Sequence, residues 1–156
     1  MWPPHRILVP TDFSKSSRAA CDVALELAQS LGVPIVLMHT FGLPASLYPE
    51  LPIIPTADYV QSLEKAARVT LEREAQRLRG EGVEIAAVLN VGNAWESVLA
   101  VAKELGIGLI VMGTHGRRGL SRAVLGSVSE KVVRLSPVPV LTIHSPPEEE
   151  SATAVV

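Results

Sequence analysis

The 156-residue sequence contains one cysteine, few aromatic residues and almost no excess of charge of either sign. Cys21 has no second cysteine with which to form a disulfide within the chain, and this favours a protein of the reducing cytoplasm. Only 4% of the residues are aromatic whereas 47% are hydrophobic, so the core has to be built mainly from aliphatic side chains. A formal net charge of −2 argues against a nucleic-acid-binding protein that relies on bulk positive charge.

Long hydrophobic runs are also missing, because no run approaches the roughly 20 residues that a membrane-spanning helix needs. The N-terminal segment lacks the layout of a secretory signal peptide. We therefore expect a cytoplasmic protein that binds neither membranes nor nucleic acid. A chain of this length is expected to form one domain, here residues 1–145, followed by a disordered tail at 146–156 that is rich in proline and glutamate.

Apolar segments that are typical of buried strands alternate along the chain with segments of helical periodicity. The strands are expected at 6–10, 35–40, 83–91, 109–112 and 138–143. The helices are expected at about 16–31, 58–79, 94–105 and 127–135. Strict alternation of five strands with four helices indicates a doubly wound α/β fold around a parallel sheet. Residues 41–57 contain four prolines and no periodicity, and we expect a long loop there.

The helical periodicity also predicts which side chains face the sheet. On the helix expected at 58–79, the inner face comprises Leu63, Ala66, Ala67, Leu71, Ala75 and Leu78. The charged residues of that helix, Glu74 among them, are expected on the outer face. On the last helix, the expected inner face comprises Val128, Val132 and Leu135. Cys21 falls on or beside the apolar face of the first helix, where we expect a core residue rather than a nucleophile.

The segment between the fourth expected strand and the last expected helix has the composition of an anion-binding loop. Its glycines and arginines are Gly113, Gly116, Arg117, Arg118, Gly119, Arg122 and Gly126. Backbone N–H groups at a helix start have no partner within the helix, and the helix dipole adds partial positive charge there. Glycine lets a phosphate approach the backbone closely, and arginine supplies countercharge. This arrangement predicts a phosphate site, although a glycine-rich linker that binds nothing would have a similar composition.

The spacing of three of these glycines, Gly113-x2-Gly116-x9-Gly126-Ser127, differs from the two best-known phosphate loops, GxxxxGK[ST] and GxGxxG. It resembles the G-x2-G-x9-G-[ST] signature of the universal stress protein family. The segment Ile7–Ser14 (ILVPTDFS) resembles the first strand and turn of that family, and residues 126–140 resemble its last helix and strand. Across residues 4–144 the resemblance implies a Rossmann-like, five-stranded parallel sheet in the order 3-2-1-4-5.

The family resemblance implies a site for an adenine nucleotide, with ATP, accompanied by Mg²⁺, as the expected ligand. The residues that the matching motifs assign to this site are Pro10, Thr11, Asp12, Thr40, Met112, Gly113, His115, Gly116, Arg117, Gly119, Gly126, Ser127, Val128 and Ser129. In that assignment Pro10 and Thr40 lie by the adenine. The start of the last helix, residues 126–129, would hold the outer phosphates through backbone N–H groups and serine hydroxyls.

The resemblance places Gly113 and Gly116 beside the ribose and the α-phosphate, whereas other residues keep a structural alternative. Asp12 either forms the turn after the first strand, or accepts hydrogen bonds from ribose hydroxyls or from a water bound to Mg²⁺. His115 and Arg117 either contact phosphate or face solvent. The remaining histidines have no metal-ligand spacing and are expected to be strand-end residues: His5, His39 and His144.

Efficient catalysis requires more than a phosphate cradle. A dedicated ATPase needs a positioned base for water and a fixed cation at the γ-phosphate, whereas the loop has no lysine and Asp12 is the one candidate base in the matched motifs. We therefore predict a stress-response regulatory protein in which bound ATP acts as a switch, with weak hydrolysis at most. The alternatives are a slow ATP hydrolase or adenylyl-transfer enzyme of similar fold, and a dimeric interaction scaffold with a vestigial site.

The strand order implied by the resemblance leaves the last strand at an edge of the sheet. Its residues, 138–143, are apolar with little charge, and an exposed edge of this kind is usually paired or covered. The resemblance implies a two-fold homodimer through this C-terminal edge strand. The alternative is that Pro139 and the tail block the edge.

Overall fold

The computed structural model describes residues 2–42, 56–114 and 125–144, in which strands and helices alternate strictly. The strands are β1 (Ile7–Pro10), β2 (Ile35–Phe41), β3 (Ile85–Val91), β4 (Leu109–Gly113) and β5 (Val140–Ile143). The helices are α1 (Lys15–Leu31), α2 (Ala57–Arg79), α3 (Ala94–Glu104) and α4 (Ser127–Leu135). The element boundaries expected from the sequence agree with these to within two residues. Most of the expected loop at 41–57 and the expected tail at 146–156 lie outside the described residues.

The five strands form one sheet in the order β3-β2-β1-β4-β5, and all four neighbouring pairs run parallel. This confirms the doubly wound α/β fold and the strand order that the family resemblance implies. The strand order reverses between β1 and β4, where Ile7 pairs with Leu109. In open α/β sheets, ligands bind at the carboxyl ends of the strands at such a reversal. The residues that follow Pro10 and Gly113 therefore lie at the position where such folds bind ligands.

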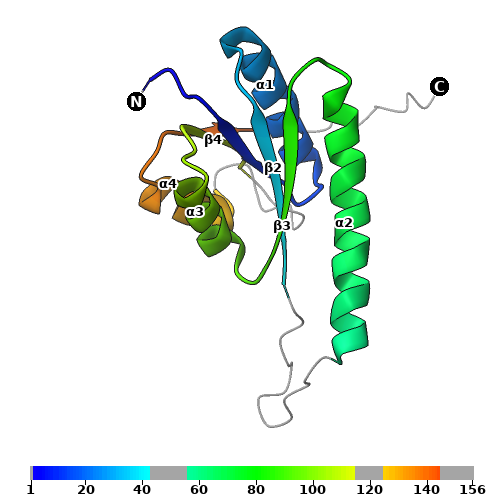
Figure 1. The fold of residues 1–156 in the computed structure, drawn as a ribbon. Helices are drawn as coiled ribbons and strands as arrows, with labels where there is room; N and C mark the ends of the chain where they lie inside the picture. The colour runs from blue at the N-terminus through cyan, green and yellow to red at the C-terminus, as the bar shows by residue number, and fades with distance from the viewer. Residues whose placement is uncertain (1, 43–55, 115–124, 145–156) are drawn as a thin grey trace, which may run out of the picture.

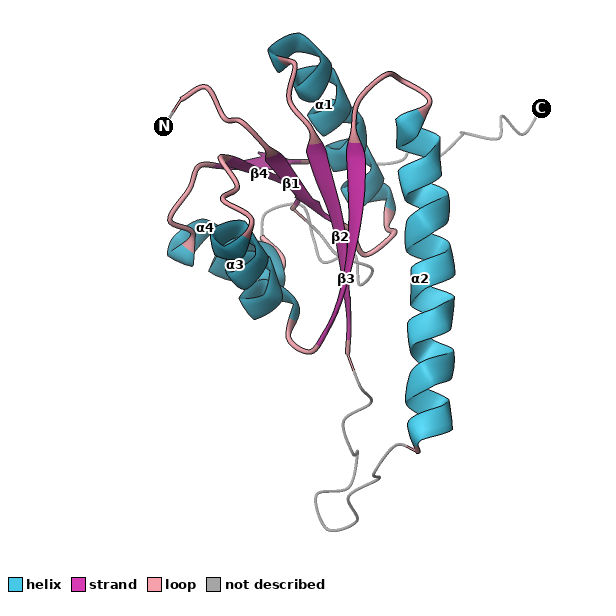
Figure 2. Ribbon diagram, viewed as in Figure 1, coloured by secondary structure: helices cyan, strands magenta, loops and turns pink. Residues whose placement is uncertain are grey.

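The helices cover the sheet on both faces, as Figure 1 shows with α2 on one side and α3 and α4 on the other. Ile7 and Val9 of β1 pack in one core cluster with α1 and α2, whereas Leu8 packs in a second cluster with α3 and α4. Figure 2 shows the same arrangement with the strands as a separate layer. Because both faces are covered, the central strands are apolar at consecutive positions, as the sequence led us to expect.

The structure corrects the predicted inner face of α2. Ala66 is exposed, because the buried residues of α2 all lie in its C-terminal half: Leu71, Glu74, Ala75 and Leu78. Glu74, expected on the outer face, is only 8% exposed, and this burial is tolerated because its carboxylate pairs with the guanidinium of Arg77. Arg77 also reaches Asp22 of α1, so the pair lies between two helices.

The predicted inner face of α4 also needs correction. Val132 is fully buried as expected, but Leu135 is 50% exposed. The buried face is centred on Ser129 and Val132, and Leu135 lies about 90° around the helix from that centre, at about 100° per residue. The prediction for Leu135 was wrong because the polar residue Ser129 occupies a buried position on this helix.

Candidate functional site

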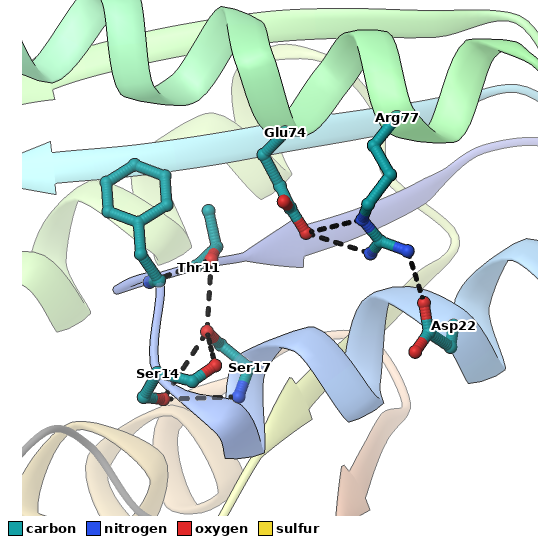
Figure 3. A network of polar contacts seen from close by, with 7 residues as sticks. Thr11, Ser14, Ser17, Asp22, Glu74 and Arg77 are labelled. Carbon is teal, nitrogen blue, oxygen red and sulfur yellow. Dashed lines mark hydrogen bonds and ion pairs between the residues drawn. The ribbon is translucent and has the colours of Figure 1, made fainter.

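Thr11, the first residue after β1, is held by hydrogen bonds on its N–H, its carbonyl and its side chain. Its N–H donates to the Met38 carbonyl at 2.7 Å, and its carbonyl accepts from Nδ1 of His39 at 2.7 Å. Its Oγ1 accepts from the N–H of Phe13 at 3.0 Å and lies 3.1 Å from Oγ of Ser17, as Figure 3 shows for the Ser17 contact. Thr11 is also only 5% exposed, so it fixes the start of the turn that carries Asp12.

Asp12 lies half-buried in the turn between β1 and α1. Its Oδ1 accepts a hydrogen bond from the N–H of Ser14 at 3.0 Å, so the turn-forming role that the sequence allows is present. Ser14 takes the N-cap position and accepts from the N–H of Ser17 at 3.2 Å. Phe13 between them has a φ of +65°, which is uncommon for a residue with a side chain. The turn thus presents a carboxylate at the carboxyl end of β1.

Gly113, at the carboxyl end of β4, approaches the first turn of α1 very closely. A Cβ at position 113 would lie 2.8 Å from the carbonyl carbon and 2.8 Å from the carbonyl oxygen of Ser16. The fold therefore needs glycine here to let α1 pack against β4. The same contact brings the Asp12 turn and Gly113, which are far apart in the sequence, to one end of the sheet.

The two ends of the segment between β4 and α4 are tied together. The N–H of Gly126 donates to the Thr114 carbonyl at 2.7 Å, and Oγ of Ser129 donates to the Gly113 carbonyl at 2.9 Å. These bonds place the N-terminus of α4 beside the carboxyl end of β4. The intervening residues with a predicted role, His115, Gly116, Arg117 and Gly119, lie outside the described residues.

The N-terminus of α4 differs from those of the other helices. Side chains of the N-cap residues Ser14, Thr56 and Asn93 accept a hydrogen bond from the first turns of α1, α2 and α3. In α4 the N-cap residue is Gly126, which has no side chain to fill this role. The first backbone N–H groups of a helix have no partner within it and carry the positive end of the helix dipole. The arrangement can accept an anion at the reversal point of the sheet.

The other predicted site residues on described positions differ in what they can offer. Met112 is 4% exposed and packs in the core with α3 and α4, so only its main chain can face a ligand. Thr40 lies half-buried near the carboxyl end of β2. Ser127 is exposed, whereas the Ser129 hydroxyl is engaged with the Gly113 carbonyl. Val128 is half-buried against the α3 and α4 core.

The family model for universal stress proteins matches residues 4–144 of the chain. The chain belongs to the universal stress protein family. Its relative YxiE from Bacillus subtilis strain 168 is 31% identical over 148 residues, which cover 90% of this chain and 99% of YxiE. UspA from Lactobacillus plantarum superposes with a TM-score of 0.75 at 26% identity, over 88% of this chain and 96% of that one. The Archaeoglobus fulgidus universal stress protein in complex with dAMP superposes with a TM-score of 0.64 at 25% identity, over 88% and 96%.

In the part of this universal stress protein that the structure describes, no helix is long and apolar enough to cross a membrane. Within the same ranges, no group of three or more His, Cys, Asp or Glu side chains could hold a metal ion. Cys21 is fully buried, as expected for a core residue, and burial raises the pKa of its thiol to about 12.

The sequence interpretation missed the part that His39 plays beside the Asp12 turn. It treated His39 as an ordinary strand-end residue, whereas the structure places its ring against Phe13 and its Nδ1 on the Thr11 carbonyl. The available signal was its position: His39 lies one residue beyond Met38, which pairs with Pro10 across the sheet. Position alone does not reveal which backbone group a side chain will contact.

Proposed function

We propose that this universal stress protein binds an adenine nucleotide, ATP with Mg²⁺, and acts in the cytoplasm as a nucleotide-dependent switch in a stress response. The observation that carries the proposal is the start of α4, which lacks a side-chain cap and is fixed at the carboxyl end of β4 by the Gly126–Thr114 hydrogen bond. Anions bind favourably at such helix starts. The dAMP complex of the Archaeoglobus fulgidus relative supports an adenine nucleotide as the occupant.

In the proposed complex, the outer phosphates lie at the backbone N–H groups of residues 127–129, with the Ser127 hydroxyl beside them. The adenine lies near Pro10 and Thr40 at the ends of β1 and β2. Asp12 accepts from the ribose or from water on Mg²⁺. One carboxylate is a sparse ligand set for Mg²⁺, so the phosphates and water would supply most of the coordination.

The loop between β4 and α4 would complete the phosphate site. Its predicted contacts are His115, Gly116, Arg117 and Gly119. Arginine suits a phosphate because the guanidinium donates several hydrogen bonds in one plane. In a switch, the ordering of such a loop by ATP would favour one conformational state, and the occupied fraction would follow the nucleotide concentration.

We propose that the protein is a homodimer through the β5 edge of its sheet. β5 is the terminal strand of the sheet, and its Leu141 is 37% exposed. Two further apolar side chains on the adjacent α4, Val133 and Leu135, are 44% and 50% exposed. An apolar edge strand with exposed apolar neighbours favours pairing with another edge.

Calorimetric titration with Mg-ATP, followed by a phosphate assay on each sample, tests the proposed switch. We expect micromolar binding of about one nucleotide per subunit, at about −8 kcal/mol, with almost no phosphate release. Steady phosphate release at a catalytic rate would overturn the switch in favour of the hydrolase. Absence of binding in protein shown to be free of co-purified nucleotide would overturn nucleotide binding altogether. The dimeric interaction scaffold with a vestigial site would then be the favoured function.

A pair of substitutions at the N-cap of α4 makes the test specific for the site. Gly126→Asp and Gly126→Asn both supply a side-chain cap, because Asp and Asn are equally good N-cap residues and Gly126 already has an extended ψ of 154°. Only Asp adds negative charge where the phosphates would lie. We expect the affinity for ATP to fall at least about tenfold further in Gly126→Asp than in Gly126→Asn, with similar unfolding midpoints. Equal affinities in the two variants would contradict the proposed phosphate position.

A further inference from the structure

A side chain of the neighbouring strand β2, His39, contacts the turn that carries Asp12. Nδ1 of His39 lies 2.7 Å from the Thr11 carbonyl oxygen, and because a carbonyl can only accept, Nδ1 carries the proton and donates. The His39 ring also contacts the Phe13 ring, with centroids 4.4 Å apart and planes tilted by 41°. His39 thus contacts the residues on both sides of Asp12.

Phe13 adopts a backbone conformation that the surroundings have to maintain. Its φ of +65° falls in the left-handed region, which a bulky residue avoids in the absence of compensating contacts. Two such contacts are present: the N–H of Phe13 donates to Oγ1 of Thr11 at 3.0 Å, and its ring lies against His39. Loss of either contact would allow the turn to relax toward a more common backbone conformation.

His39 and its neighbour Thr40 lie on opposite faces of β2. Ile35 and Leu37 pack in the core with α1 and α2, so by strand alternation His39 lies on that face and Thr40 on the other. Thr40 is the residue placed beside the adenine in the proposed complex. Two successive residues of β2 therefore face the two parts of the site, one holding the Asp12 turn and the other approaching the nucleotide.

We propose that His39 is a positioning residue that, together with Phe13, holds the Asp12 carboxylate in the orientation that binds the nucleotide. This inference rests on the proposed nucleotide binding. His39 does not touch the ligand; it raises the fraction of molecules whose turn is already in the binding conformation. Molecules whose turn has relaxed bind the nucleotide without the Asp12 contact. Loss of the His39 hydrogen bond therefore lowers the average affinity toward that of a protein without the carboxylate, although His39 itself makes no ligand contact.

Two substitutions separate the hydrogen bond from the ring contact. His39→Phe keeps an aromatic ring beside Phe13 and removes the donor, whereas His39→Asn keeps an N–H donor near the position of Nδ1 and removes the ring. We expect His39→Phe to weaken Mg-ATP binding about fivefold or more, the usual effect of losing one such hydrogen bond, and His39→Asn to recover most of that loss. Leu37→Val, on the same face of β2, is the control for general destabilisation and should leave the affinity unchanged.

A double-mutant cycle shows whether His39 acts through Asp12. In the wild-type background we expect Asp12→Asn to weaken Mg-ATP binding about tenfold, and in the His39→Phe background about twofold or less, because the carboxylate is then no longer positioned. Independent, multiplicative losses in the two backgrounds would overturn the proposal. Amide hydrogen exchange supplies a readout without nucleotide: the N–H groups of Phe13 and Ser14 should exchange faster in His39→Phe, and unchanged exchange would also overturn it.

The outcomes distinguish this inference from the proposed function on which it rests. If the wild-type protein fails to bind Mg-ATP, both the proposed function and the role of His39 are overturned. If the wild-type protein binds Mg-ATP and His39→Phe binds it equally well, nucleotide binding stands and the positioning role is overturned.

Discussion

The main chain of Gly113, at the end of β4, lies directly against the main chain of Ser16 in the first turn of α1. A Cβ at position 113 would lie 2.8 Å from both the carbonyl carbon and the carbonyl oxygen of Ser16. The first glycine of the G-x2-G-x9-G-[ST] signature is therefore required by helix packing, independently of any ligand. The contact also brings the turn after β1 to the end of β4, so packing and site geometry depend on the same residue.

Gly113→Ala should destabilise the protein by about 1–3 kcal/mol, because the clash is with backbone atoms that cannot rotate away. Gly80→Ala is the matched control: its φ of −62° suits alanine, and its Cβ would lie 4.0 Å from the Arg77 carbonyl oxygen, an ordinary van der Waals contact. We expect the control to stay within about 0.5 kcal/mol of wild type. Urea unfolding of both variants measures the difference, and an unchanged stability in Gly113→Ala would contradict the packing role.

The two serines at the start of α4 should differ in what they affect: Ser129 mainly stability, and Ser127 mainly ATP binding. The buried Ser129 hydroxyl donates to the Gly113 carbonyl, so Ser129→Ala should lower the free energy of unfolding by about 1–2 kcal/mol. Ser127 is exposed, so Ser127→Ala should leave stability unchanged and weaken ATP binding severalfold. Unfolding curves and ATP titrations of both variants test this. A larger loss of stability in Ser127→Ala than in Ser129→Ala would contradict it.

Arg77 connects α2 to α1 through two carboxylates, as Figure 3 shows. Its guanidinium lies 2.8 Å from the buried Glu74 carboxylate and 2.9 Å from Asp22, and the hydrogen bond with Glu74 raises the pKa of Arg77. Arg77→Met should destabilise by about 1–3 kcal/mol because Glu74 loses this partner. Arg68→Met removes an exposed pair with Glu64 and should cost less than about 0.5 kcal/mol. Equal losses in thermal or urea unfolding would contradict the importance of burial.

The order and approximate limits of the strands and helices could be predicted because both depend on local pattern. Apolar runs indicate buried strands, and the 3.6-residue period indicates helices packed on them. The strand order needed the family resemblance, since many orders are compatible with the same alternation. With that order, the meeting of the Asp12 turn with Gly113 at one end of the sheet follows, and the structure confirms the proximity through Ser16. Their nucleotide contacts stay predictions.

The features that sequence reasoning missed depend on contacts between distant segments. The Glu74 carboxylate pairs with Arg77, which also reaches Asp22 of α1, and a helical period carries no information about that second helix. His39 of β2 contacts Thr11 and Phe13, which follow β1, and its local sequence gives no sign of these neighbours either. In each case the residue type and the local pattern suggest a different environment from the one that the tertiary contacts produce.

The proposed dimer predicts that a charge on the β5 edge separates the subunits. Leu141→Glu introduces a carboxylate at a 37% exposed apolar position of this edge strand, where burial between subunits would leave it unpaired. We expect the wild type to be a dimer and Leu141→Glu a monomer by light scattering at micromolar concentration. Val69→Glu, at a 53% exposed position of α2, is the control and should remain dimeric. A monomeric wild type, or dissociation of both variants, would contradict an interface through β5.

The buried thiol of Cys21 predicts how stability changes at high pH. Burial, aided by the nearby Glu74 carboxylate, raises the pKa of Cys21 from 9.0 to about 12. Because the folded-state pKa exceeds the unfolded value, the resulting stabilisation is fully present below pH 9 and is lost as the pH rises toward 12. Between pH 8 and pH 10.5, the free energy of unfolding of wild type should fall by about 2 kcal/mol more than that of Cys21→Ala, which lacks the titrating group. Urea unfolding of both proteins at each pH tests this, and parallel losses would show that the thiol ionises equally easily in both states.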